Sequence, residues 1–171
     1  ARMLRPKVKE ILGRDIKLES IITSVKRAKA GYKPLAGNIT KVIAESIINI
    51  RTDVAKISVD KTRRNLEKIR KTIANFSEEF FHIIEGTSAI TLIFDQKLLD
   101  EIYSLFPEKE VLDKRQNLAA IFICSPRELI STPGCVLAFY NVVSRRHINI
   151  EETMSCFTDT IIVLGMEDVS K

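Results

Sequence analysis

Apolar residues near the start of the chain recur every three or four positions, which is the spacing of one face of a helix. They are Leu18, Ile21, Ile22 and Val25. This spacing predicts a helix that runs on toward Gly31. A shorter helix is expected before it, at 6–12. Gly13 is expected to end this helix, because glycine readily adopts the left-handed backbone conformation of a helix end. The chain therefore begins with a helical segment.

A loop and a third helix are expected next. Pro34 lies in segment 32–37, whose composition favours a loop. Asn38 is a suitable N-cap for a helix, and the apolar residues from there on share one helical face. They are Ile39, Val42, Ile43 and Ile47.

From residue 51 the apolar pattern alternates between strand and helix periods. The expected elements are a strand at 54–59, a helix at 62–75, strands at 80–85 and 89–94, and a helix at 97–106. The order strand, helix, strand, strand, helix is that of a ferredoxin-like unit.

The same order recurs in the last third of the chain. The expected elements are a strand at 118–124, a helix at 133–146, strands at 148–156 and 160–164, and the start of a helix at 167–171. The predicted fold class is α+β: tandem ferredoxin-like (βαββα) units preceded by a small helical segment. We expect the basic helical segment at 1–50, the first unit at 51–110 and the second at 111–171, with the second unit's C-terminal strand not present in the chain.

Composition narrows the function classes. Hydrophobic residues make up 45% of the 171 residues and charged residues 29%, which is ordinary for a soluble globular protein. No apolar run is long enough to cross a bilayer, so we expect no membrane partner. The three cysteines form no Cys-x-x-Cys pair, which indicates buried, reduced thiols in the cytoplasm, with no metal and no cofactor. They are Cys124, Cys135 and Cys156.

Positive charge is concentrated at the start of the chain. Residues 1–48 hold eleven basic and four acidic residues, a net charge of +7, although the whole chain carries only +5. The helical pattern and this charge predict weak binding to duplex DNA through Lys26, Arg27 and Lys29; a plain solvated face is the alternative. Interleaved aromatic residues for stacking on single strands are missing, so RNA is less favoured.

The candidate ligand site begins at the run Ser131-Thr132-Pro133-Gly134. Thr132 is a plausible N-cap, and Pro133 suits the first helical position because its missing N–H is not needed there. Gly134 puts no side chain in the way of a small molecule. The N–H groups of Gly134 and Cys135 could then bind a carboxylate at the helix N-terminus. The alternative is an ordinary helix cap that binds no ligand.

A second short motif follows the helix. Ile148-Asn149-Ile150 predicts the opening of a strand, with Asn149 facing away from the core. We expect a free amino acid between the start of the helix and Asn149, held also by the hydroxyls of Ser131 and Thr132. Gly134→Val is then expected to abolish binding while leaving the fold largely intact.

Together these motifs resemble an ACT domain, the amino-acid-sensing module of aspartokinase and related regulators. Pro133-Gly134 stands just inside the first helix and Ile148-Asn149-Ile150 at the second strand, while His147 stands where the family usually has glycine. Residues 51–171 resemble aspartokinase's tandem ACT region, although the first unit lacks Pro-Gly at 60–63. The resemblance implies a homo-oligomer whose modules align sheets or pack helices, with ligands at the seam.

The sequence shows no Gly-rich phosphate loop, no Ser/His/Asp order and no metal-ligand spacing. We therefore expect no enzyme and no catalytic residue. The expected function is a cytoplasmic regulatory protein that senses an amino acid, for example as a transcriptional regulator. The alternative is a stand-alone regulatory subunit that controls an aspartokinase-type enzyme, and a purely structural dimerisation module ranks third.

Overall fold

The computed structural model describes residues 2–31, 36–73, 76 and 79–171. They fall into two compact units, Ala1–Gly37 and Asn38–Lys171, which we treat separately. We call them the helical unit and the sheet body. The loop expected at 32–37 lies mostly outside the described residues.

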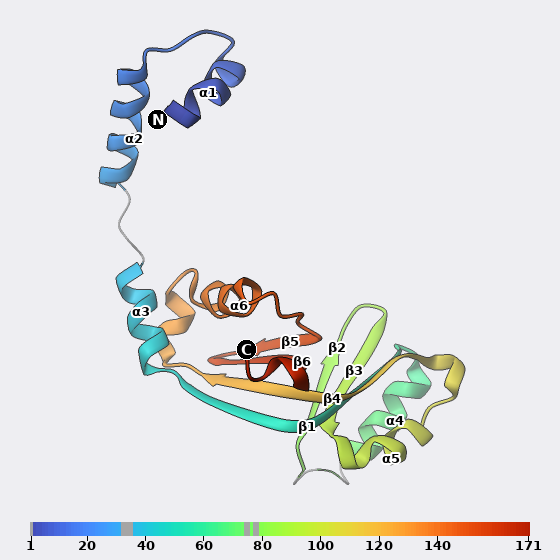
Figure 1. Ribbon diagram of the computed structural model, residues 1–171. Helices are drawn as coiled ribbons and strands as arrows, with labels where there is room; N and C mark the ends of the chain where they lie inside the picture. The colour runs from blue at the N-terminus through green and yellow to red at the C-terminus, as the bar shows by residue number, and fades with distance from the viewer. Residues whose placement is uncertain (1, 32–35, 74–75, 77–78) are drawn as a thin grey trace. The chain divides into compact units, whose positions relative to one another are not determined.

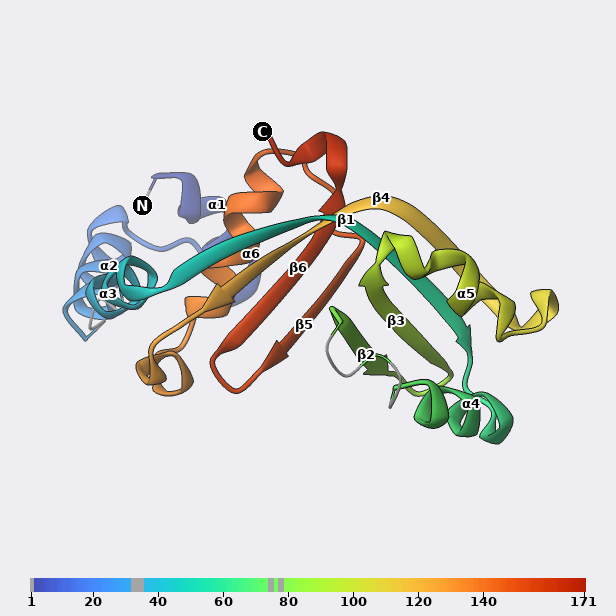
Figure 2. The same ribbon diagram turned by 90° about the horizontal axis from the view of Figure 1, so that it is seen from below.

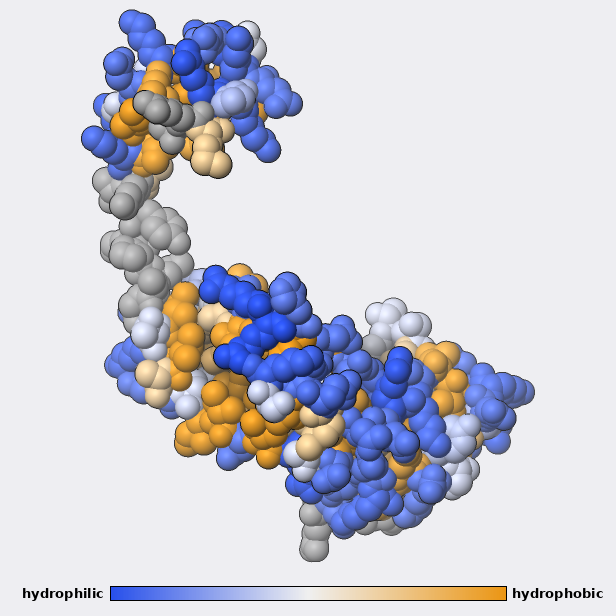
Figure 3. Space-filling model, in the orientation of Figure 1, coloured by the Kyte–Doolittle hydropathy of each residue, from blue (hydrophilic) through white to orange (hydrophobic). Residues whose placement is uncertain are grey.

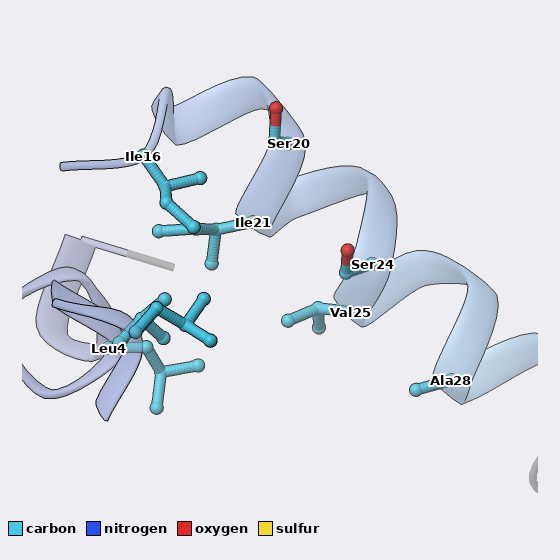
Figure 4. A pocket seen from close by; sticks show the side chains of 9 residues that line it. Leu4, Ile16, Ser20, Ile21, Ser24, Val25 and Ala28 are labelled. Carbon is cyan, nitrogen blue, oxygen red and sulfur yellow. The ribbon is translucent and has the colours of Figure 1, made fainter. Parts of the chain in front are cut away.

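The helical unit contains a 3-10 turn at Arg2–Leu4 and two helices, α1 (Arg5–Leu12) and α2 (Leu18–Gly31). The predicted stop at Gly13 is confirmed, because Gly13 has a left-handed φ of 66°. An open apolar groove of about 420 Å³ lies between the helices, and side chains from both point into it (Figure 4). Its lining is Leu4, Val8, Leu12, Ile16, Ser20, Ile21, Ser24, Val25 and Ala28.

The third helix, α3 (Ala36–Glu45), differs at both ends from its prediction. Asn38 lies inside the helix and not at its N-cap. Ile47 is not helical, because Ser46 ends the helix: its N–H donates to the Ile43 carbonyl and its hydroxyl to the Val42 carbonyl. Ser46 also hydrogen-bonds Ser125 through their hydroxyls at 3.0 Å, which ties this end of α3 to the sheet body.

A single antiparallel sheet of six strands organises the body, in the order β2-β3-β1-β4-β6-β5 (Figures 1 and 2). Its strands are β1 (Ile47–Asp60), β2 (Phe81–Glu85), β3 (Ala89–Asp95), β4 (Val111–Cys124), β5 (Glu152–Cys156) and β6 (Asp159–Gly165). The predicted α+β class with tandem units is confirmed.

Two of these strands are fourteen residues long and belong to both repeats. Residues 54–60 of β1 pair with β3, and residues 118–124 of β4 pair with β6. We define the first half-sheet as β2, β3, residues 54–60 and residues 111–115, and the second as β5, β6, residues 118–124 and residues 47–51. In the second half-sheet the position beside β4 is thus held by the start of β1.

Backbone irregularities mark the place where the long strands pass from one half-sheet to the other. Asp53 and Asn117 both have a positive φ, of 55° and 56°, and the β1–β4 register shifts between Arg51 and Val54. Two further contacts fix this crossing: Arg51 forms an ion pair with Asp95 at 2.7 Å, and the Asn117 N–H donates to the Gln96 side chain. The crossing lets one pair of strands serve two units.

Helices cover one face of each half-sheet, and three apolar clusters form the core. Helices α4 (Arg63–Ile73) and α5 (Leu99–Ser104), with the 3-10 turn Gln96–Leu98 before α5, cover the first half-sheet (Figure 2). Helix α6 (Cys135–Arg145) and Val42 of α3 pack on the second. A third cluster on the opposite faces joins both half-sheets, for example through Ile93 and Val163. Further 3-10 turns lie at Glu108–Glu110, Arg127–Ser131 and Met166–Asp168.

Candidate functional site

The predicted ligand residues at the start of α6 adopt a different turn from the one expected. Thr132 is not the N-cap, since its hydroxyl donates to the Glu128 carbonyl at 2.8 Å within the preceding 3-10 turn. Pro133 precedes the helix and does not occupy its first position. Gly134 is the N-cap, with a left-handed φ of 91°. The helix begins at Cys135, so the turn needs glycine for its backbone conformation.

This turn leaves the N-terminus of α6 open. Among the described residues no side chain caps it. The Cys135 N–H reaches only the Thr132 carbonyl, at 3.4 Å. The first N–H groups of a helix have no partners inside it and carry partial positive charge, so they favour an anion. Ser131, Pro133 and Gly134 are all exposed beside this end.

A polar pocket of about 240 Å³ lies beside Ser131 and Thr132, in the turn that leads to this N-terminus. Residues of α3 form one wall, and the 3-10 turn and Thr132 form the other. The lining is Asn38, Lys41, Val42, Glu45, Glu128, Ser131 and Thr132. One lysine and two glutamates therefore line the same space, and Lys41 pairs with Glu45 across one turn of α3 at 3.8 Å. Such a lining suits a small molecule that carries both signs of charge.

Sequence reasoning missed the α3 wall of this pocket. Asn38 was expected to cap a helix, and Lys41 was counted only as part of the basic start of the chain. Nothing in the local pattern joins these residues to Ser131, because their proximity depends on how α3 packs against the body. The packing is close: a Cβ built on Gly134 would lie 3.3 Å from Cδ1 of Ile39.

This contact also corrects the expected effect of Gly134→Val. A β-branched residue at a φ of 91° is strained whatever space surrounds it. The substitution would therefore disturb the turn and the α3 contact directly, so loss of binding in it would not identify a ligand contact.

Ile148, Asn149 and Ile150 lie at the other end of α6. His147 follows Arg146, the C-cap of α6, and has a left-handed φ of 56°. Contrary to the prediction these residues do not open the strand, since β5 begins at Glu152. At 1.5 Å per residue the eleven residues of α6 span about 16 Å, so one chain does not bring Asn149 beside Gly134.

Asn149 itself is exposed, as expected, while Ile148 and Ile150 pack against the α6 cluster. Its side-chain amide donates to the Glu151 carboxylate at 2.9 Å. The predicted residues therefore form two separate groups, 131–135 at the start of α6 and 148–150 after its end.

Cysteine placement is only partly as expected. Cys135 is buried, and burial raises the pKa of its thiol; Cys124 and Cys156 are exposed, contrary to the prediction. Both face Asp159, on opposite sides of β6. Two strand spacings separate them by about 9–10 Å, which is too far for a disulfide. Within the described ranges no three His, Cys, Asp or Glu side chains gather as a metal site requires.

The residues predicted to contact DNA all belong to α2. Lys26 and Arg27 are exposed, while the side chain of Lys29 lies outside the described set. No helix in the described part of the chain is both long and apolar enough to cross a membrane.

No protein-family model matches the sequence, and no curated protein matches it either. Solved structures do. The regulatory subunit of aspartate kinase from Thermus thermophilus matches with a TM-score of 0.58 and 17% identity, over 72% of this chain and 88% of that chain. The corresponding subunit from Thermus flavus gives 0.59 and 16%, over 72% and 90%.

The aspartate kinase from Synechocystis matches with a TM-score of 0.60 and 16% identity, over 75% of this chain but only 26% of that chain. The matched region is thus a minor part of a full kinase and nearly all of a regulatory subunit. At these identities the likeness concerns the fold. The sheet body therefore has the tandem ACT-type fold of aspartate kinase regulatory subunits.

Proposed function

We propose that this chain is a non-catalytic, cytoplasmic regulatory protein that binds an amino acid at the start of α6. The observation that carries the proposal is the open helix N-terminus beside a pocket of mixed charge. A ligand carboxylate would accept hydrogen bonds from first-turn N–H groups and pair with Lys41. Glu45 and Glu128 would face the ligand ammonium.

A second copy of the chain would complete the site. Asn149 is exposed but lies at the opposite end of α6, so it could meet the same ligand only from another copy. The resemblance to ACT modules, whose ligands sit at a seam between modules, supports this arrangement. We therefore propose a homodimer as the smallest binding form.

A thermal-shift screen against the twenty L-amino acids tests the proposal, because a ligand of the native state raises the melting temperature. We expect one or a few amino acids to do so, and Lys41→Met to weaken the shift. Lys109→Met, an exposed lysine in the turn Glu108–Glu110, is the matched control and should bind as the wild type does. If no amino acid shifts the melting temperature, or if both variants bind equally, the site is wrong.

The output of such a sensor is a separate part of the proposal. The charge of residues 1–48 favours duplex DNA, through Lys26, Arg27 and Lys29. The regulatory subunits that share the fold favour an aspartokinase-type enzyme instead. Titration with duplex DNA at two salt concentrations separates them, since phosphate contacts give steep salt dependence. Absence of binding at low salt would leave the enzyme partner as the better candidate.

A further inference from the structure

Lys56 is a buried lysine inside the sheet, with only 6% of its surface exposed. It lies in β1, on the face opposite Ala55 and Ile57, where its neighbours along the strand are Val54 and Ser58. Lysine is almost never buried unless its ammonium is paired. Its partners therefore show what this residue does.

Those partners come from both half-sheets. The Lys56 ammonium donates to the backbone carbonyl of Glu151 at 2.8 Å and lies 3.6 Å from the Glu151 carboxylate. It lies 3.4 Å from the carboxylate of Asp113, which in turn pairs with Arg115 at 3.3 Å. Asp113 belongs to the first half-sheet and Glu151 leads into β5 of the second. The side chain of Lys56 thus connects the two half-sheets.

The chain of contacts continues to the candidate ligand residue. The Glu151 carboxylate accepts a hydrogen bond from the Asn149 amide at 2.9 Å, and the Glu151 N–H donates to the Val163 carbonyl at 2.8 Å. The segment 148–151 has no strand pairing of its own before β5 begins. Lys56 and Val163 are therefore the anchors that fix its backbone at Glu151.

We propose that Lys56 is a positioning residue that holds segment 148–151, and with it Asn149, in place against the first half-sheet. Through Lys56, the position of candidate ligand residues 148–150 depends on the first half-sheet. This inference rests on the proposed function only where it concerns the ligand; the anchoring of the segment stands apart from it. Removing the ammonium should release the segment without unfolding the sheet.

Lys61 offers a matched control. Its ammonium also donates to a backbone carbonyl, that of Gly86 at 2.9 Å, and pairs with a carboxylate, that of Glu85 at 2.8 Å. Both partners lie at the β2–β3 turn of the first half-sheet. Lys61→Met therefore removes the same kinds of contact as Lys56→Met but touches nothing in segment 148–151.

Amide hydrogen exchange on the full chain without ligand tests the anchoring directly. In Lys56→Met we expect exchange in segment 148–151 to rise by about tenfold or more, with the β1 and β3 amides of the first half-sheet unchanged. Lys61→Met should leave the segment as in the wild type. Equal exchange of the segment in all three proteins would overturn the proposal.

Lys56→Met leaves the carboxylates of Asp113 and Glu151 without their buried cation, and that alone could unfold the chain. The triple variant Lys56→Met, Asp113→Asn, Glu151→Gln removes this charge while keeping an acceptor for Asn149. It should show the same faster exchange of segment 148–151. A folded triple variant with wild-type exchange there would refute the anchoring.

Binding of whichever L-amino acid raises the melting temperature gives the second readout. Lys56→Met should weaken it, and should weaken it no further when Asn149→Ala is already present, because both changes act through Asn149. Full additivity of the two variants would contradict the positioning role. If no amino acid binds the wild type, the proposed function fails, whereas the exchange experiment still decides whether Lys56 anchors the segment.

Discussion

The two repeats close their strand-to-helix turns in opposite ways. After residues 54–60 of β1, the Thr62 hydroxyl accepts the Asn65 N–H at 3.1 Å, and the Asn65 side chain donates to the Asp60 carbonyl at 2.9 Å. After β4, a 3-10 turn and the left-handed Gly134 intervene, and no side chain of a described residue caps α6. One turn caps its helix with its own polar groups, whereas the other leaves the first N–H groups of α6 without a side-chain partner among the described residues.

Helix coverage differs as well. Helices α4 and α5 cover the first half-sheet, whereas on the second, which α6 and Val42 of α3 cover, Ile48 and Ile50 remain 57% and 53% exposed. Figure 3 shows this contrast, with apolar surface gathered over the end of the body that holds the start of β1. The fold therefore tolerates one closed and one open repeat.

The largest expected effect compares isoleucines at the same strand position of each repeat. Ile57 pairs with Leu92 and is fully buried under α5, while Ile121 pairs with Ile162 and is half-buried. Ile57→Ala should lower the free energy of unfolding by about 3–4 kcal/mol and Ile121→Ala by about 1–2 kcal/mol. Urea denaturation measures both. Equal losses would show that the second half-sheet is as well covered as the first.

The next effect concerns the open turn. Gly134→Ala should destabilise the protein by about 1–2 kcal/mol, because a Cβ is unfavourable at a left-handed φ. Its Cβ would also press on Ile39, 3.3 Å away. In an Ile39→Ala background the same substitution should be less costly, since only the backbone strain remains. A loss that is the same in both backgrounds would mean that α3 does not press on this turn.

The sequence predicted the repeat order but not the length of its shared strands. Residues 54–59 and 118–124 stood out because they are β-branched and apolar. The start of β1, in the second half-sheet, did not stand out, because Ile47 continues the helical spacing of α3. The start of β4, in the first half-sheet, did not stand out either, because residues 113–117 are polar and form an exposed edge. The periodicity of apolar residues along the chain cannot identify these strand segments, since their formation depends on which strand pairs with them.

The candidate site was predicted in part for the same reason. Pro133-Gly134 indicated a turn before a helix. That Gly134 and not Thr132 is the N-cap depends on the left-handed φ of Gly134, which the sequence pattern does not reveal. Asn149 was expected beside that turn because the motif suggested a strand, whereas α6 separates the two. Lys41 lines the same pocket as Glu128, 87 residues away along the chain, and Lys56 donates to the carbonyl of Glu151, 95 residues away.

A smaller effect tests the closed turn. Thr62→Ala should lower the free energy of unfolding by about 1 kcal/mol, because it removes the side chain that caps α4. Ser131→Ala is the matched change in the other repeat and should be nearly neutral, since the Ser131 hydroxyl donates to the Glu128 carbonyl at 3.3 Å and caps no helix. Thermal unfolding of the two variants is the measurement. The reverse ranking would remove the distinction between the turns.

The smallest effect is a pH dependence that only the first repeat should show. His82, the second residue of β2, lies against the rings of Phe80 and Phe122 at centroid distances of 4.9 and 6.0 Å. Burial lowers the pKa of its imidazole below the usual 6.5, so folding favours the neutral ring. Its contribution to stability is therefore complete above pH 6.5 and is lost as the pH falls through the lower pKa of the folded state.

The corresponding second residue of β5 is Thr153, which does not titrate; its hydroxyl bonds Tyr140 at 2.8 Å. Between about pH 7.5 and pH 5, His82→Phe should lose less stability than the wild type, by under about 1.4 kcal/mol, which is the equivalent of one pKa unit. Thr153→Val should lose as much as the wild type over this interval, although it is less stable at both ends. Urea denaturation at the two pH values measures these differences. An identical loss in His82→Phe and the wild type would mean that folding does not change the protonation of His82. The contact of His82 with Phe122, which connects the two half-sheets, would then not contribute to the pH dependence of stability.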